Sequence, residues 1–224
     1  MDHKNTQAVE DYLKTIYAMT LSGERASTNG IAERLGVAPA SATGMIQKLA
    51  IMQPPLVEYE KHYGAALTSA GKIAALEIVR HHRLLETFLF EKLGYSWDEV
   101  HVEADRLEHV ISEDMEERIA RILGDPRIDP HGEPIPDREF QIPDELDISL
   151  EDLCLGDQAI IERIRDGEPG LLRYLTSIGL TLHCHIKVLD VIPFDRNIQL
   201  QIEGQDEPKV LGPRVAHKIY VSRV

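Results

Sequence analysis

The sequence predicts a mainly α-helical protein with small β parts. Apolar residues recur at helical spacing through most of residues 9–123, as in amphipathic helices. One short alternating stretch, residues 56–67, interrupts them. Five prolines then mark residues 124–150 as a linker, and short apolar runs separated by turn residues fill the last third. We therefore expect two helical segments, a linker and a small C-terminal β-barrel with one helical insert.

Composition excludes several classes of protein. The chain has 224 residues, of which 43% are hydrophobic and 28% charged, and these values are typical of folded globular proteins. No apolar run is long enough to span a membrane, and the first residues do not resemble a signal peptide. We expect a cytoplasmic protein without a membrane partner. Two cysteines cannot form a disulfide framework.

The net charge of −14 is unevenly distributed. Residues 1–75 are neutral, residues 76–150 carry a net charge of −12, and residues 151–224 carry −2. An acidic surface repels the phosphates of nucleic acid, so a DNA contact is expected in the neutral first third. The acidic middle third would instead attract cations.

The first third has the pattern of a helix-turn-helix. One helix is expected from Val9 to near Gly23, and a second is capped by Thr28 or Asn29 and ends at Gly36. Pro39 suits the first position of a third helix. Two short helices joined by a turn with glycine are typical of this motif, although an ordinary corner between helices has the same pattern.

The stretch 56–67 predicts a hairpin, or wing, with its turn at residues 61–64. Polar residues on the exposed side of the third helix are placed for base and phosphate contacts, and the wing adds two more. An exposed hairpin tip without a ligand would look the same. The candidate DNA-binding residues are Pro39, Ser41, Thr43, Gln47, Lys48, Lys61 and His62.

The middle third contains residues typical of metal ligands. A helix is expected from Thr68 to Leu93, and a capping box at residues 96–99 opens another that runs to about Leu123. Four side chains would share one edge of that helix, namely His101, Asp105, Glu108 and His109. His82 and Glu86 are spaced i, i+4 on the preceding helix. Local ion pairs on a solvated face are the alternative. Trp97 and His131 are interpreted as packing or linker residues.

In several motifs the chain resembles the diphtheria-toxin-repressor-like family of metal-dependent transcriptional regulators. The resemblance rests on the motifs VEDYLKTIY, IAERLGVAPASATGMIQKL, LTSAGKIA, HHRLLETFL, HVEADRLEH and DPRIDPHGEPIP, in that order. It implies a winged helix-turn-helix domain (residues 1–75), a helical metal-binding and dimerisation domain (76–145) and an SH3-like, FeoA-like domain (146–224).

The resemblance also assigns roles to residues. It implies primary metal ligands at Asp11, Asp105, Glu108 and His109, and ancillary ligands at His82, Glu86 and His101. Iron-responsive members carry Met and Cys at the positions of Asp11 and Asp105. Oxygen ligands there favour Mn(II) over Fe(II). Lys14 departs from the Glu of manganese-type members, and Arg163 stands where iron-type members place a carboxylate.

The function expected from these features is a homodimeric repressor of metal-ion homeostasis, activated by Mn2+ and bound to a palindromic operator in double-stranded DNA. An Fe2+-responsive regulator of the same family is the first alternative. A helical-bundle metalloenzyme and a metal-independent DNA-binding module are alternatives of other classes. No catalytic motif is present, so we expect no enzymatic activity.

Overall fold

The computed structural model describes residues 3–21, 23–142, 148–165 and 168–224. The chain forms two compact units. The first contains Met1–His81, Glu108–Ile111 and Pro136–Gln141, and the second contains His82–Leu107, Ser112–Ile135 and Ile142–Val224. The domain boundary expected between residues 145 and 146 lies outside the described residues.

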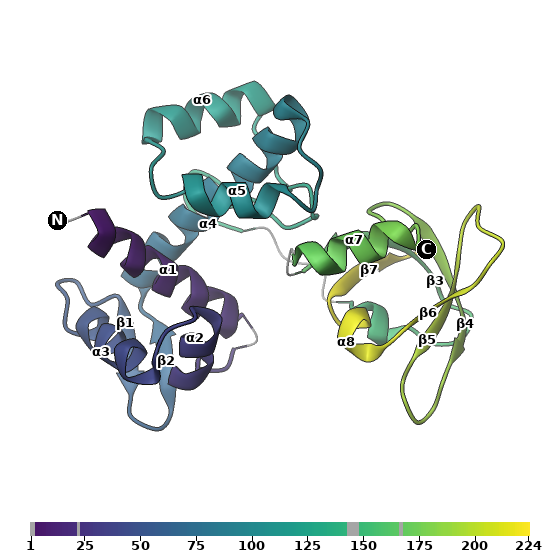
Figure 1. Ribbon diagram of the computed structural model, residues 1–224, viewed down its shortest axis with the longest axis horizontal. Coiled ribbons are helices and arrows are strands. Elements are labelled where there is room, and N and C mark those ends of the chain that lie inside the picture. The colour runs from purple at the N-terminus through teal and green to yellow at the C-terminus, as the bar shows by residue number, and fades with distance from the viewer. Residues whose placement is uncertain (1–2, 22, 143–147, 166–167) are drawn as a thin grey trace. The chain divides into compact units, whose positions relative to one another are not determined.

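Before residue 69, the described part of the first unit consists of three helices and a hairpin (Figure 1). The helices are α1 (His3–Thr20), α2 (Thr28–Arg34) and α3 (Pro39–Ala50). Their apolar faces meet in one core, whose fully buried members include Leu13, Ile16, Ile31, Ile46 and Leu49. This packing confirms the predicted helix-turn-helix, because α2 and α3 are joined only by residues 35–38.

The ends of α2 and α3 follow from local chemistry. Ser27, and not Thr28 or Asn29 as expected, caps α2: its backbone is extended and its hydroxyl accepts a hydrogen bond from the Gly30 N–H. Thr28 already belongs to the helix. Gly36 has a left-handed backbone with φ of 65°, and Pro39 begins α3 as predicted.

The wing is an antiparallel pair, β1 (Val57–Glu60) and β2 (Gly64–Leu67), with Val57 opposite Leu67. Ala26 extends this pair through a bridge to Ala65. Gly64 has φ of 102°, and a Cβ at this position would lie 2.5 Å from the Ala26 carbonyl oxygen. The hairpin therefore requires glycine here.

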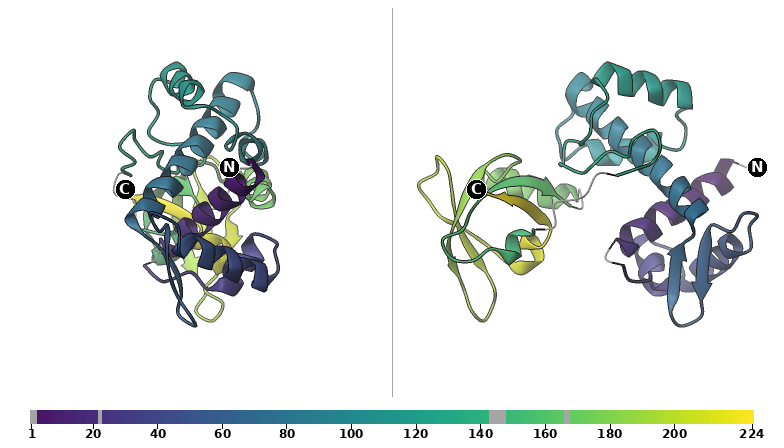
Figure 2. Two further views of the ribbon diagram at one scale, coloured as in Figure 1. Left: turned by 90° about the vertical axis from the view of Figure 1, so that its left-hand side faces the viewer. Right: turned by 180° about the vertical axis from the view of Figure 1, so that it is seen from behind.

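The helix α4 (Ser69–Leu93) is continuous and ends at Gly94 as predicted (Figure 2). The expected helix from residue 97 to 123 is wrong, because the chain forms two helices there, α5 (Val100–Leu107) and α6 (Glu113–Leu123). Ser112 has an extended backbone and its hydroxyl caps α6 at the Met115 N–H, so a new helix begins. Glu108 and His109 consequently lie in the turn between the two helices.

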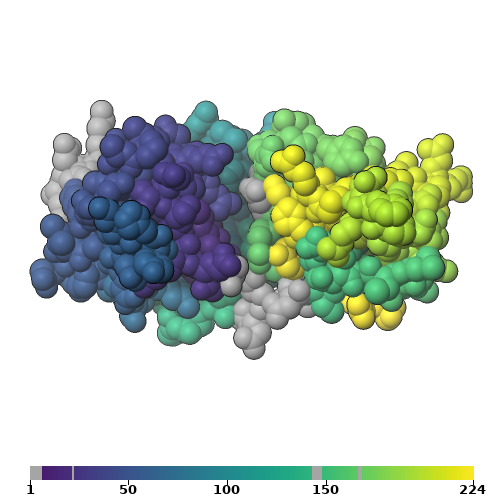
Figure 3. Space-filling view, turned by 90° about the horizontal axis from the view of Figure 1, so that it is seen from below, coloured from purple at the N-terminus to yellow at the C-terminus, as the bar shows by residue number. Residues whose placement is uncertain are grey.

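The C-terminal β domain, residues 148–224, has a five-stranded antiparallel sheet in the order β6-β5-β4-β3-β7. The strands are β3 (Gln158–Ile164), β4 (His185–Val191), β5 (Ile198–Ile202), β6 (Lys209–Leu211) and β7 (Ile219–Arg223). Helices η1 (Leu150–Asp152), α7 (Pro169–Ser177) and α8 (Pro213–Ala216) complete it, and Figure 3 shows its closely packed surface in green to yellow.

The predicted β character and helical insert of this domain are confirmed, but the sheet is open where a closed barrel was expected. Among the described residues, the edge strands β6 and β7 do not pair with each other. Alternating side chains of β5 and β7 enter a separate core, which includes Ile161, Leu172 and Leu200.

Over the described residues, every helix falls short of the length or the hydropathy that crossing a membrane requires.

Candidate metal centre and nucleic-acid interface

One group of potential ligands lies in the first unit and joins α1 to the turn at residues 108–111. His109 Nδ1 is 2.6 Å from Glu10 Oε2, and His109 Nε2 is 3.0 Å from Asp11 Oδ1. Glu108 Oε1 is 3.3 Å from the same Nε2. We call Asp11, Glu108 and His109, whose ligand atoms lie within 4.8 Å of one another, the first ligand group.

The electrostatics of this group favour a cation. Burial alone would lower the pKa of His109, but its hydrogen bonds to Asp11 and Glu10 and the charge of Glu108 raise that pKa to about 9. His109 therefore holds a proton between carboxylates at neutral pH. A divalent ion can replace that proton, because a neutral imidazole nitrogen is a metal ligand.

Lys14 supplies a second positive charge. Its ammonium donates to both oxygens of the Glu108 carboxylate, at 2.7 and 2.9 Å. The Glu108 side chain is 1% exposed and that of Lys14 is 24% exposed, so the pair is largely shielded from water. A metal ion bound to Glu108 would have to share the carboxylate with Lys14.

A second group lies in the second unit, between α4 and α5. His82 Nε2 is 2.9 Å from Glu86 Oε1, and His101 Nδ1 is 3.1 Å from the same oxygen. Asp105 lies beside both histidines, 3.4 Å from His82 Nδ1 and 3.5 Å from His101 Nε2. We call His82, Glu86 and His101 the second ligand group. The i, i+4 spacing on α4 thus brings His82 and Glu86 together as predicted.

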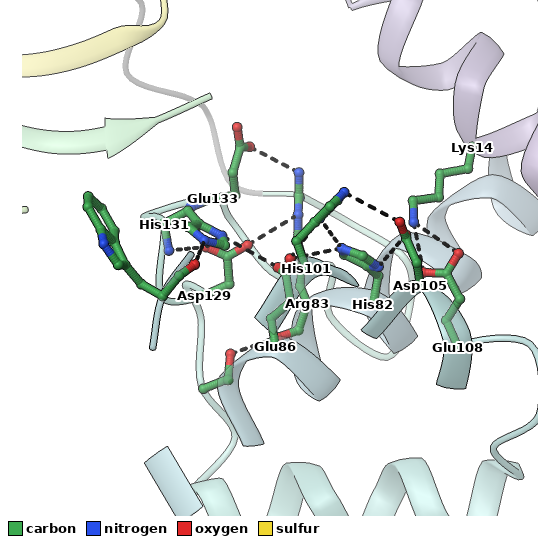
Figure 4. A network of polar contacts seen from close by, with 12 residues as sticks. Lys14, His82, Arg83, Glu86, His101, Asp105, Glu108, Asp129, His131 and Glu133 are labelled. Atoms are coloured by element: carbon green, nitrogen blue, oxygen red, sulfur yellow. Dashed lines mark hydrogen bonds and ion pairs between the residues drawn. The ribbon is translucent and has the colours of Figure 1, made fainter. Parts of the chain in front are cut away.

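The second group extends to residues that no sequence pattern singles out. Asp129 and His131 are buried, and together with Glu86 they form a further cluster of three potential ligands. His131 Nδ1 is 3.7 Å from Glu86 Oε2, so Glu86 lies between two sets of ligands (Figure 4). Of the two interpretations of His131, packing or linker, the structure supports packing, because His131 is buried and its segment folds against α4. Its one sequence signal was a histidine between two turn residues, Pro130 and Gly132.

At this second site burial and charge act in opposite directions on the pKa values of Glu86 and His131, and in the same direction on that of Asp129. Burial alone would raise the pKa of Glu86, but the charge of His82 and hydrogen bonds from the histidines around it hold that pKa well below its usual range. Burial and the nearby Glu86 charge raise the pKa of Asp129 to about 7. Burial alone would lower the pKa of His131, but its contacts with Glu86 raise it to about 9.

The donor atoms of both groups suit a hard or borderline divalent cation. All are carboxylate oxygens and imidazole nitrogens, and neither Cys154 nor Cys184 belongs to a group. Such donors fit Mn, Fe, Co, Ni or Zn, whereas thiolates would favour softer ions. The residues present therefore fit a divalent metal.

The candidate nucleic-acid contacts all lie in the first unit. On α3, Pro39, Ser41, Gln47 and Lys48 are exposed, while Thr43 is partly buried and its hydroxyl donates to the Pro39 carbonyl. The hairpin turn exposes Lys61 and His62. A helix with exposed polar side chains beside a wing has the form of a recognition helix.

Three family models match successive parts of the chain. Residues 4–65 match the iron dependent repressor, N-terminal DNA binding domain, and residues 68–137 match the iron dependent repressor, metal binding and dimerisation domain. Residues 148–223 match the FeoA domain. The matched segments follow the order of the elements described above.

Individual relatives carry similar descriptions. The iron-dependent repressor IdeR of Mycobacterium tuberculosis strain H37Rv is 37% identical over 57% of this chain, and the match spans about half of that relative, 54%. The HTH-type transcriptional regulator MntR of Oceanobacillus iheyensis is 37% identical over 53% of this chain and 78% of that protein.

Solved structures match over almost the full chain. A manganese-dependent transcriptional repressor in complex with manganese is 41% identical, with a TM-score of 0.89 over 96% of this chain and 100% of that one. The manganese regulator SloR is 30% identical, with a TM-score of 0.83 over 96% of this chain and 98% of that one. The chain therefore belongs to the diphtheria-toxin-repressor-like family of metal-dependent transcriptional repressors.

Proposed function

We propose that this chain is a homodimeric, Mn(II)-activated repressor of metal-ion homeostasis genes that binds a palindromic operator in double-stranded DNA. The observation that carries the proposal is the first ligand group. Asp11 belongs to α1, which packs in the core of the helix-turn-helix unit, and it lies 3.0 Å from His109. A cation held here would act directly on the element that supports the recognition helix.

The seven proposed metal ligands are those expected from the sequence, and the buried pair Asp129 and His131 adds to them. A bound divalent cation supplies positive charge among carboxylates that otherwise repel one another. Without it, Glu10, Asp11 and Glu108 depend on the His109 proton and the Lys14 ammonium for charge balance. Metal binding and DNA binding are reciprocally coupled if both favour the same position of α1.

Manganese is proposed over iron because the ligands are oxygen and nitrogen atoms without sulfur. Mn(II) binds weakly in general and depends on such oxygen-rich sites. Similar solved structures are described as manganese-dependent, and similar sequences as iron-dependent repressors. Fe(II) remains the alternative activator.

Dimerisation is proposed for the segment matched to the metal-binding and dimerisation model. That segment exposes several large apolar side chains, which a partner subunit would cover: Phe90, Leu93, Val102, Met115 and Ile122. A twofold dimer presents two α3 helices to two half-sites of a palindrome. Exposed Ser41, Gln47 and Lys48 would then contact bases and phosphates.

The test is fluorescence anisotropy of DNA from the protein's own promoter region, in chelator and with Mn(II), Fe(II) or Zn(II) titrated separately at fixed salt. We expect binding to appear at a lower concentration of Mn(II) than of Fe(II). Asp11→Ala should weaken Mn(II) activation without unfolding the protein. Asp195→Ala, which removes an exposed carboxylate outside both groups, is the matched control.

The outcomes separate the alternatives. Undiminished Mn(II) activation of Asp11→Ala would overturn the proposed link between Asp11 and DNA binding. Equal DNA binding in chelator would identify a metal-independent DNA-binding module, and the acidic clusters would then have only structural roles. Metal-dependent turnover without DNA binding would support the metalloenzyme.

A further inference from the structure

Gly44, in the middle of α3, is a glycine that the fold itself does not require. Many other glycines adopt a left-handed backbone, such as Gly36 with φ of 65°. Others lie against neighbouring atoms, such as Gly71, where a Cβ would collide with the Leu56 carbonyl group. Among the glycines that the structure describes, Gly44 alone has neither a positive φ nor any atom within 4 Å of an added Cβ.

Glycine at this position weakens α3. Gly44 lies inside the helix Pro39–Ala50, where glycine is less favourable than alanine because its backbone loses more conformational freedom on folding. Alanine would raise the folding equilibrium constant about four- to fivefold. Since glycine gains no contact within the chain, the benefit that offsets this cost lies outside it. Glycine is the residue that lets another molecule approach the backbone closely.

Gly44 lies at the centre of the exposed face of α3. The opposite face is buried in the core of the first unit, and at 3.6 residues per turn Gly44 is about 180° from the middle of that buried face. Ser41 and Gln47, one turn before and one turn after Gly44, are exposed candidate DNA contacts. The helix therefore presents bare backbone between two of its proposed contact residues.

An open hollow adjoins this bare backbone. It has a volume of about 590 Å³ and lies between the second half of α3 and Tyr59 of the wing strand β1, two elements that are neighbours in Figure 1. The remaining lining residues are Gly44, Gln47, Lys48, Ala50 and Ile51. The surface that would face DNA is thus recessed at Gly44.

The recess suits an apolar group of a base. As part of α3, the N–H and C=O groups of Gly44 form the hydrogen bonds of the helix, so they are not available to a base edge. A polar base group placed against them would lose its water without gaining a partner. The apolar group that bases present in the major groove is the methyl group of thymine.

We propose that Gly44 is a specificity-determining residue, which lets the backbone of α3 contact the methyl group of a thymine in the operator. A larger residue would fill the place of that methyl group and hold α3 away from the base edges. The inference rests on the proposed operator binding and adds a contact that the polar candidate residues do not make.

The test compares Gly44→Ala with the unaltered full chain, by fluorescence anisotropy of promoter DNA in saturating Mn(II) at fixed salt. One form of the DNA contains thymidine, and the other contains deoxyuridine, which lacks the methyl group. On thymidine DNA, Gly44→Ala should bind at least about fivefold more weakly, as a mismatched base pair does. On deoxyuridine DNA, the unaltered chain should lose affinity and the difference between the two proteins should disappear. Replacing thymidines one at a time should then locate the contacted base pair.

Two controls separate this contact from effects on folding. Urea denaturation should show that Gly44→Ala is more stable than the unaltered chain, so its weaker DNA binding would not arise from unfolding. Gly170→Ala in α7 is the matched substitution, because Gly170 also lacks a positive φ and the nearest atom to its Cβ would be 3.8 Å away. It should leave the affinity for DNA unchanged.

Equal affinity of Gly44→Ala and the unaltered chain for thymidine DNA would overturn the inference. An equal loss on both forms of DNA would also overturn it, as would lower stability of Gly44→Ala, since glycine would then serve the fold. Unchanged DNA binding in chelator would overturn metal activation alone, because the comparison at Gly44 is made with metal present. If the unaltered chain bound no promoter DNA with any metal, operator binding and this inference would both be wrong.

Discussion

Replacing Lys14 by Met should destabilise the metal-free protein and strengthen its binding of Mn(II). Both oxygens of the Glu108 carboxylate accept from the Lys14 ammonium, at 2.7 and 2.9 Å, and the Glu108 side chain is 1% exposed. Removing one partner of a buried ion pair costs about 3 to 5 kcal/mol. The Glu108 carboxylate keeps its contact with protonated His109, at 3.3 Å, which lowers this cost. Because Lys14 is 24% exposed, water recovers part of this loss, and we expect about 2 to 3 kcal/mol.

This loss in stability of the metal-free protein also sets the change in its affinity for Mn(II). A divalent ion at Glu108 supplies the charge that Lys14 provided, so the penalty falls on the metal-free state. With about 1.4 kcal/mol for each factor of ten, the affinity of Lys14→Met for Mn(II) should rise about 30- to 140-fold.

The assay is urea denaturation in chelator and in saturating Mn(II), together with a direct Mn(II) titration. Lys72→Met is the matched control, because Lys72 is an exposed lysine near the start of α4 and its loss changes the net charge equally. If both variants were equally stable in chelator and bound Mn(II) with the affinity of the unaltered chain, the competition between Lys14 and metal would be refuted.

Three further predictions concern pH, the core and a helix cap. Folding raises the pKa values of His109 and His131 to about 9. Their protonation therefore stabilises the folded state fully below the usual histidine pKa, and this contribution is lost as pH rises through 9. The free energy of unfolding in chelator should fall between about pH 6.5 and 9. Mn(II) should reduce this fall by replacing the protons. A free energy of unfolding, measured by urea denaturation in chelator, that stays constant or rises toward pH 9 would contradict the prediction. Ile46→Ala in the core of α3 should destabilise by about 2 to 5 kcal/mol in thermal denaturation, against less than about 0.5 kcal/mol for exposed Ile51→Ala, and equal effects would refute the packing argument. Ser112→Ala should lower stability by about 1 kcal/mol in the same assay, whereas Ser112→Asp should retain the cap on α6; equal losses would argue against capping.

Much of the fold could be predicted because the relevant signals are local. The ends of α3 and α4 follow from Pro39 and Gly94, and the hairpin follows from alternation between residues 56 and 67. His82 and Glu86 share a face because α-helical geometry fixes the spacing i, i+4. Such features depend on a few neighbouring residues, so the chain specifies them before it packs.

Other parts of the site carry no local signal. The break after Leu107 depends on the Ser112 cap, which competes with continued helical periodicity across residues 108–112. The approach of Asp11 to His109 joins residues 98 positions apart and was expected only from the family resemblance. Asp129 and His131 become candidate ligands only when an irregular, proline-rich segment is buried against α4.

The sequence by itself determined the helices, the wing, the uneven charge and the ligand types, because periodicity, capping and composition are properties of short segments. Only the tertiary structure decided which carboxylates contact His109, that Lys14 forms an ion pair with Glu108, and that the β domain lies against Gly132. These contacts join distant segments, whose approach depends on the packing of whole cores, and no periodicity along the chain encodes it.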